Sequence, residues 1–136
     1  MNIEAELLFE ITEEITGITR EEILSKKRKP DIVDAKKMMA LSFFKNTKFT
    51  FEKIGEILGG LDHSSISYYV KNHDSLMETD VDFMTNFSNI NSKFKIYQDG
   101  GIPNEIKLRF ALEERKKINK KISKLKKLLK FKSENN

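Results

Sequence analysis

The sequence contains no cysteine, only two prolines and no long hydrophobic run. Without cysteine the chain can form neither a disulfide framework nor a thiolate metal site, so a reducing compartment is allowed. No stretch approaches the roughly 18 apolar residues of a membrane span. The first ten residues, MNIEAELLFE, carry acids where a signal peptide needs positive charge. We therefore expect a cytoplasmic protein with no membrane partner.

Charges of both signs are present, but they are unevenly distributed. The net charge is +4, and residues 104–132 hold 12 Lys and Arg against 3 Glu. Residues 1–103, in contrast, hold 13 basic and 17 acidic side chains. Any basic patch in the first hundred residues must therefore come from local clustering, and one cluster exists at SKKRK, residues 25–29.

Helical periodicity dominates the chain. Apolar residues recur at spacings of three and four, which predicts amphipathic helices. Asn2 is a candidate cap, TREE at 19–22 matches a capping box, and Pro30 predicts a helix start near Asp31. The helices predicted in this way cover residues 2–16, a short segment up to about 24, 31–46, 50–58, 62 or 63 to about 72, and 76–98. The predicted buried positions include Ile32, Ala35, Met39 and Phe43 in the third helix, and Met84, Phe87, Ile90, Phe94 and Tyr97 in the sixth.

A helix-turn-helix is predicted around the glycine pair Gly59 and Gly60. A helix that ends at these glycines, a tight turn and a second helix match the geometry of that motif. The segment DGGIP, residues 99–103, is the clearest break in the chain. We therefore predict an all-α fold: a helix-turn-helix bundle of about six helices over residues 1–98, a linker at 99–103, and a long basic C-terminal helix at 104–136.

The C-terminal helix carries a heptad-like seam. Its positions alternate spacings of four and three, with an arginine at the second: Ala111, Arg115, Ile118, Ile122, Leu125 and Leu129. An amphipathic helix lying on the body of the protein and a homodimeric coiled coil both fit this pattern. Residues 115–132 also contain ten basic side chains and no acid. Such a run is either solvated or attracted to a polyphosphate surface.

The stretch GGLDHSSIS, residues 59–67, places an acid, a histidine and hydroxyls side by side. Consecutive residues at a helix start point in different directions, so they do not converge as a catalytic triad requires. His63 and His73 are ten residues apart, which does not match a metal-binding pair on one helical face. Short polar side chains at the start of a recognition helix can instead reach base edges in the major groove. The alternative is that Asp62 is only an N-cap and that the serines only fill the first turn.

The segment ITGITREEILSKKRKPDIVDAKKMMALSFFKNTKFTFEKIGEILGGLDHSSISYYVK resembles the C-terminal DNA-binding domain of DnaA, the bacterial replication initiator. The resemblance rests on the short helix that ends in ILSK, the basic loop, the long helix, EKIGEILGG, and the signature GG-x-DH-[ST]-[ST]-[VI], and it spans roughly residues 3–95. It implies a helix-turn-helix fold like that of the DnaA C-terminal domain and the Trp repressor, without catalytic residues, metal or cofactor.

The resemblance also implies which residues contact DNA. The arginine of the basic loop enters the minor groove in that family, which nominates Arg28, with Lys26 and Lys27 beside it for phosphates. The signature nominates Asp62, His63, Ser64 and Ser65 for the major groove. Lys36 and Lys71 fall where the family has basic residues near the DNA backbone.

Several positions depart from the family pattern. Leu61 replaces the usual arginine of the signature, and serines replace threonines whose methyl groups could meet a thymine methyl. Asp34 and Phe44 stand where the family is often basic. The Walker motif G-x-x-x-x-G-K-[ST] of the initiator's ATPase domain does not occur in these 136 residues. We therefore expect a stand-alone relative that binds no nucleotide, and the departures lower the affinity expected for the standard initiator box.

The sequence predicts a protein that is not an enzyme and that binds double-stranded DNA at a replication origin or promoter. It would act there as an accessory factor or repressor, for instance of a phage or plasmid. An alternative is a protein-interaction module that keeps the same scaffold and recruits a partner through the C-terminal coiled coil. RNA or single-strand binding is a further alternative, because Tyr68 and Tyr69 could stack on bases.

Overall fold

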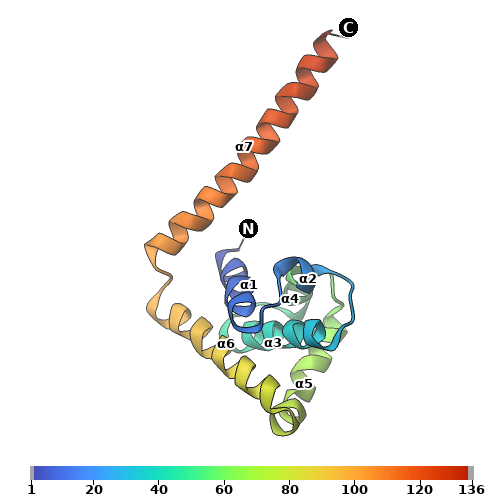
Figure 1. Ribbon diagram of the computed structural model, residues 1–136, viewed down its shortest axis with the longest axis vertical. Helices are drawn as coiled ribbons and strands as arrows, with labels where there is room; N and C mark the ends of the chain where they lie inside the picture. Colours follow the sequence, from blue (N-terminus) through green and yellow to red (C-terminus); the bar gives the residue numbers. More distant parts are fainter. Residues whose placement is uncertain (1, 135–136) are drawn as a thin grey trace. The chain divides into compact units, whose positions relative to one another are not determined.

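The computed structural model describes residues 2–134, and these residues form helices and no strands (Figure 1). The helices are α1 (Ile3–Thr16), α2 (Arg20–Leu24), α3 (Pro30–Asn46), α4 (Phe51–Ile57), α5 (His63–Thr79), α6 (Val81–Gly100) and α7 (Asn104–Glu134). The chain divides into two compact units, and the boundary falls between Gly101 and Ile102. The all-α class predicted from the sequence is confirmed.

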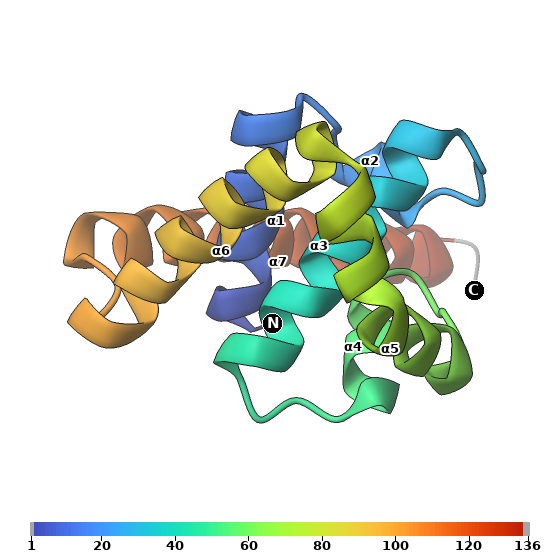
Figure 2. The same cartoon turned by 90° about the horizontal axis from the view of Figure 1, so that it is seen from below.

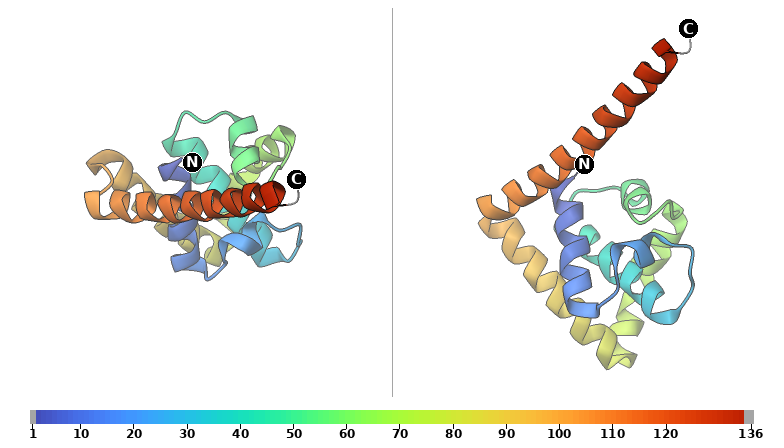
Figure 3. Two further views of the ribbon diagram at one scale, coloured as in Figure 1. Left: turned by 90° about the horizontal axis from the view of Figure 1, so that it is seen from above. Right: turned by 45° about the horizontal axis from the view of Figure 1, so that its top comes forward.

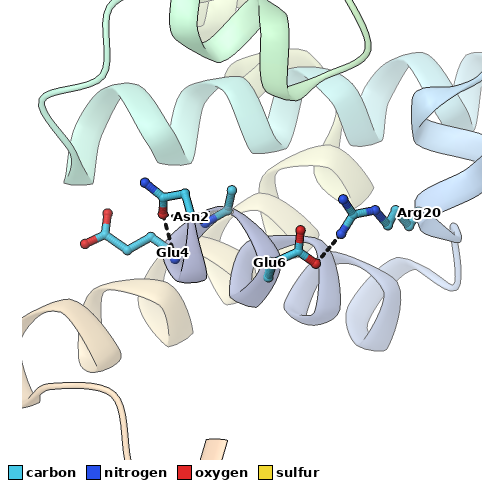
Figure 4. Close-up of polar contacts among 5 residues, drawn as sticks. Asn2, Glu4, Glu6 and Arg20 are labelled. Carbon is cyan, nitrogen blue, oxygen red and sulfur yellow. Dashed lines mark hydrogen bonds and ion pairs between the residues drawn. The ribbon is translucent and has the colours of Figure 1, made fainter. Parts of the chain in front are cut away.

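The predicted caps at the start of the chain are present. The Asn2 side chain accepts hydrogen bonds from the amides of Glu4 at 2.8 Å and Ala5 at 3.2 Å (Figure 4). The capping box predicted from TREE is present at the start of α2. The Thr19 side chain accepts from the Glu22 amide, and the Glu22 side chain accepts from the Thr19 amide. Each cap satisfies amides that the first turn of a helix otherwise leaves without partners.

An ion pair and a cation–π contact hold α2 against α1. The Arg20 guanidinium pairs with the Glu6 carboxylate (Figure 4) and lies 4.6 Å from the centre of the Phe9 ring. This arrangement fixes the start of α2, and therefore also the point at which the following basic loop leaves the bundle.

Helix α3 is the centre of the first unit. It contacts α1, α2, α4, α5 and α6, and Figure 2 shows α1 and α6 crossing close to it. The predicted core positions Ile32, Ala35, Met39 and Phe43 are all buried. The Phe43 ring meets the Phe94 ring of α6 edge-to-face at 6.1 Å, a geometry that contributes about 0.5–1.5 kcal/mol beyond area burial.

Two predicted boundaries between α5 and α6 are wrong. Helix α5 does not end near Asn72 but continues to Thr79, because residues 73–79 contain neither glycine nor proline. Helix α6 starts at Val81 instead of 76, since the Asp80 side chain accepts from the Phe83 amide at 2.9 Å and caps it there. Helix α6 also continues through Gly100, and the chain turns at Gly101 with φ 82°.

Not all of the residues predicted on the inner face of α6 are buried. Met84, predicted on the inner face, is 39% exposed. The buried positions are Phe83, Phe87, Ile90 and Phe94. Helix α3 itself begins one residue earlier than predicted because Pro30 occupies its first turn, where a missing N–H costs nothing.

The turn of the helix-turn-helix depends on glycine. The Gly55 carbonyl accepts hydrogen bonds from the amides of Gly60 and Leu61, both at 2.9 Å. Gly59 and Gly60 have φ of 94° and 92°, a region that residues with a side chain rarely adopt. A Cβ atom on Gly55 would lie 2.0 Å from the Leu61 carbonyl oxygen, so α4 and the turn approach as closely as a backbone allows.

The second unit consists of α7, 31 residues long and therefore about 46 Å in length. Figure 3 shows it as one uninterrupted helix, and it contains no buried residue. None of the helices in the part of the chain that the structure describes is long and apolar enough to span a membrane.

The replacement Gly55→Ala tests the close approach between α4 and the Leu61 carbonyl. We expect the free energy of unfolding to fall by about 1–3 kcal/mol, because the new methyl group collides with backbone that cannot rotate away. Urea denaturation measures the change. Gly100→Ala, which meets no atom within 4 Å, is the matched control and should lie within about 1 kcal/mol of wild type. Equal stability of the Gly55 and Gly100 variants would contradict the predicted collision.

Candidate nucleic-acid interface

The basic loop between α2 and α3 is fixed at its start and exposed along its length. The Ser25 hydroxyl donates to the Glu22 carbonyl at 2.6 Å and accepts from the Lys27 amide at 3.3 Å. Residues 26–29, the sequence KKRK, are all exposed. Their cations are therefore presented to solvent from a backbone whose first residues are held in place.

Lys36 lies beneath this loop rather than beside it. The residue is only 7% exposed, and its ammonium donates to the Ser25 carbonyl at 2.9 Å. Burial lowers the pKa of the Lys36 ammonium below its ordinary value. The Lys36 ammonium is thus bound within the protein, where it anchors the loop to α3.

The start of α5 exposes a small hydrogen-bonded cluster. The Asp62 carboxylate accepts from the Ser64 hydroxyl at 2.9 Å and lies 3.0 Å from Nδ1 of His63. These contacts, that of Ser64 foremost, lower the pKa of the Asp62 carboxyl. Asp62 occupies the N-cap position, yet its side chain makes no capping hydrogen bond. The carboxylate is therefore held by neighbouring side chains and not by the first turn of α5.

A cleft of about 510 Å³ brings the basic loop and α5 together. Its lining includes Lys26, Lys27 and Arg28 from the loop and Ser65 and Tyr69 from α5. The two segments can lie this close because Gly59 packs on the end of α2: a Cβ atom on Gly59 would lie 3.1 Å from the Leu24 carbonyl oxygen. The basic loop and one face of α5 therefore share a single cleft.

Other members of the predicted set flank the cleft. Asp62, His63 and Ser64 are exposed at the start of α5, and Lys71 is exposed two turns further along the same helix. Tyr69 also lines the cleft, a position not predicted from the sequence. The signal for it was present, because Tyr69 follows Ser65 by four residues and both therefore lie on one face of α5. Burial raises the pKa of the Tyr69 hydroxyl, and the Lys37 ammonium lies 5.8 Å from the centre of its ring.

The comparison with protein families decides the class of this fold. The family model described as the bacterial dnaA protein helix-turn-helix matches residues 5–72, which is half of the chain. The chain belongs to this family. The match extends from α1 into α5 and includes every predicted site residue. Neither a curated protein nor a solved structure matches the chain.

Membership of the DnaA helix-turn-helix family indicates DNA binding in general. Both segments that the DnaA resemblance nominated, the basic loop and the start of α5, lie in the matched region and border one cleft. The basic loop and the start of α5 therefore belong to one surface of the first unit.

The buried position of Lys36 can be tested by titration. Side-chain NMR should show that the pKa of the Lys36 ammonium lies below the ordinary lysine value of 10.5, because burial disfavours its charged form. Because the unfolded chain then binds the proton more tightly, the free energy of unfolding should rise with pH in the interval just below 10.5. This rise should disappear in Lys36→Met. Titration of Lys36 at the ordinary lysine value would show that its ammonium is not desolvated.

Proposed function

We propose that the protein binds double-stranded DNA in a sequence-specific manner, with Arg28 in the minor groove and the start of α5 in the adjacent major groove. The observation that carries this proposal is the cleft that Arg28 and its lysine neighbours share with Ser65 and Tyr69. A loop and a helix start that border one cleft can follow one phosphate strand, with a groove on either side.

The cluster at the start of α5 supplies groups that distinguish base edges. A carboxylate accepts from the amino group of cytosine, and serine hydroxyls can donate or accept. When Nδ1 of His63 donates to Asp62, its Nε2 is left as an acceptor, which suits an amino group of adenine or cytosine. Asp62 would therefore both read a base and fix the tautomer of His63.

Phosphate contacts would come from Lys26, Lys27 and Lys71, which are exposed. For Lys36 we propose an indirect role, because its ammonium already binds the Ser25 carbonyl. It would hold the loop in the shape that directs Arg28 toward the groove.

The departures from the DnaA pattern support a target other than the standard initiator box. Leu61 adds no charge to the turn, and Asp34, whose carboxyl pKa is raised mainly by burial, adds no phosphate attraction on α3. We propose that the protein occupies sites at a replication origin or promoter, as an accessory factor or repressor.

A protein-interaction module is the second candidate, and Phe44 favours it. Its side chain is 45% exposed and its ring lies 5.7 Å from that of Phe51. An exposed phenylalanine beside a second, half-buried aromatic ring suits a protein partner. Binding to random-sequence duplex DNA in a gel shift at moderate salt separates the candidates, since an interaction module without DNA binding would give no shift.

Arg28→Ala tests the minor-groove contact. Selection from a random duplex library first provides the preferred site, and fluorescence anisotropy then measures affinity. We expect a loss of about 1–3 kcal/mol at that site, with a smaller loss on random DNA. Lys95→Ala on α6, outside the cleft, is the matched control and should bind like wild type. Wild-type affinity of the Arg28 variant would refute the proposed contact.

The basic face of α7 provides a second test. We propose that Lys120, Lys124 and Lys127, which share one face of the helix, contact phosphates. Replacing all three by glutamine should reduce the slope of log affinity against log salt by up to about 2.7, since each neutralised phosphate contributes about 0.9. The triple Lys→Arg variant keeps the charge and should keep the slope. An unchanged slope in the glutamine variant would show that this face does not touch DNA.

A further inference from the structure

Helix α7 exposes a largely apolar seam on the face opposite four of its lysines. The seam alternates spacings of three and four and consists of Leu108, Ala111, Arg115, Ile118, Ile122, Leu125 and Leu129. Ile118 is 56% and Ile122 44% exposed. The lysines at 117, 120, 124 and 127 lie on the other side of the helix. One face is thus suited to burial against an apolar surface while the charged face keeps its contact with water.

We propose that the α7 seam binds the same seam of a second copy of this chain, and that the two helices run antiparallel. The occupant is a second copy because the seam is complementary to itself in this orientation. In heptad terms Leu108, Arg115, Ile122 and Leu129 are a positions, and Ala111, Ile118 and Leu125 are d positions.

The size of the seam residues favours the antiparallel orientation. In a parallel pair each residue meets its own equivalent, which stacks Arg115 on Arg115 and Ala111 on Ala111 inside the core. In an antiparallel pair each a residue meets a d residue of the second copy. Ala111 then faces Leu129, Arg115 faces Leu125, and Ile118 faces Ile122. Every arginine meets a leucine against which its aliphatic stem can pack, and the smallest residue meets a large one.

Charges beside the seam favour the same orientation. In the parallel pair Lys121 lies next to Lys126 of the second copy, a repulsion that occurs twice. The antiparallel pair instead places Lys121 beside Glu114 of the second copy, and Lys126 beside Asn119. Two repulsions of the parallel pair are thereby replaced by two attractions. This difference disfavours the parallel orientation and also stabilises the antiparallel one.

The antiparallel pair has a consequence for DNA binding. Leu108 of one copy lies opposite Lys132 of the other, so the two copies of Leu108 are separated by about 36 Å along the helix axis. The two DNA-binding units of the dimer are then joined to opposite ends of the pair, while both lysine faces stay exposed. A dimer of this kind would bind DNA with two sites more tightly than DNA with one. That consequence rests on the proposed function, whereas the dimer does not.

Sedimentation of the full chain without DNA tests the seam. We expect a mass that rises from monomer to dimer with concentration, and a double variant, Ile118→Glu with Ile122→Glu, that stays monomeric. Lys120→Glu with Lys124→Glu places the same side chains on the opposite face and should still form the dimer. A wild-type monomer at every concentration, or a dimer that survives the Ile118 and Ile122 changes, would overturn the proposal.

Cysteine cross-linking tests the orientation, because the chain has no cysteine of its own. A mixture of Ala111→Cys and Leu129→Cys chains should oxidise to a mixed disulfide, since these positions face each other in the antiparallel pair. Leu129→Cys alone should form little disulfide dimer, because its two copies lie far apart. Efficient self-linking of Leu129→Cys would show a parallel pair instead. Arg28→Ala should dimerise like wild type, so failure of DNA binding and failure of the dimer are distinguishable.

Discussion

The first unit depends on backbone approaching backbone at two glycines. At Gly55 the Leu61 carbonyl occupies the space of a side chain, and at Gly59 a Cβ atom would lie only 3.1 Å from the Leu24 carbonyl oxygen at the end of α2. The first contact sets where α5 begins after α4. The second sets how far the basic loop lies from α5, because Leu24 immediately precedes that loop. The cleft between loop and helix is therefore a consequence of two positions that tolerate no side chain.

A side-chain contact then fixes the conformation of the basic loop. Lys36 reaches from α3 to the Ser25 carbonyl, and the Ser25 hydroxyl in turn accepts from the Lys27 amide. Removing a lysine ammonium from water costs free energy, and the lowered pKa of Lys36 reflects that cost. In return, the Lys36 contact orders a loop of four consecutive cations that would otherwise have no hydrogen bond to α3. Order would matter for the proposed function, in which Arg28 enters a narrow groove in one orientation.

Local signals in the sequence predicted much of the fold, and their limits are physical. Asn2, the Thr19–Glu22 capping box and the glycine pair act through neighbouring residues, so they could be found without a structure. The end of α5 was not predicted correctly, because no glycine or proline near Asn72 marks a helix end. The helix ends at Thr79, where Asp80 caps α6 and Phe83 packs into the core. The site could be predicted only in part for the same reason. The family pattern predicted that Lys36 contacts the DNA backbone, but its burial depends on tertiary packing, because α3 passes under the loop.

The distribution of charge separates affinity from sequence reading. Residues 1–103 carry more acids than bases, so the unit that holds the cleft has little long-range attraction for a polyanion. The surplus of positive over negative charge lies on α7, whose lysines can attract phosphates of any sequence. In the proposed function, changes on α7 would therefore shift affinity for all DNA together, whereas changes between Asp62 and Ser65 would alter which base pairs are preferred. Because phosphate attraction carries no sequence information, a protein with this arrangement can strengthen its binding without losing discrimination.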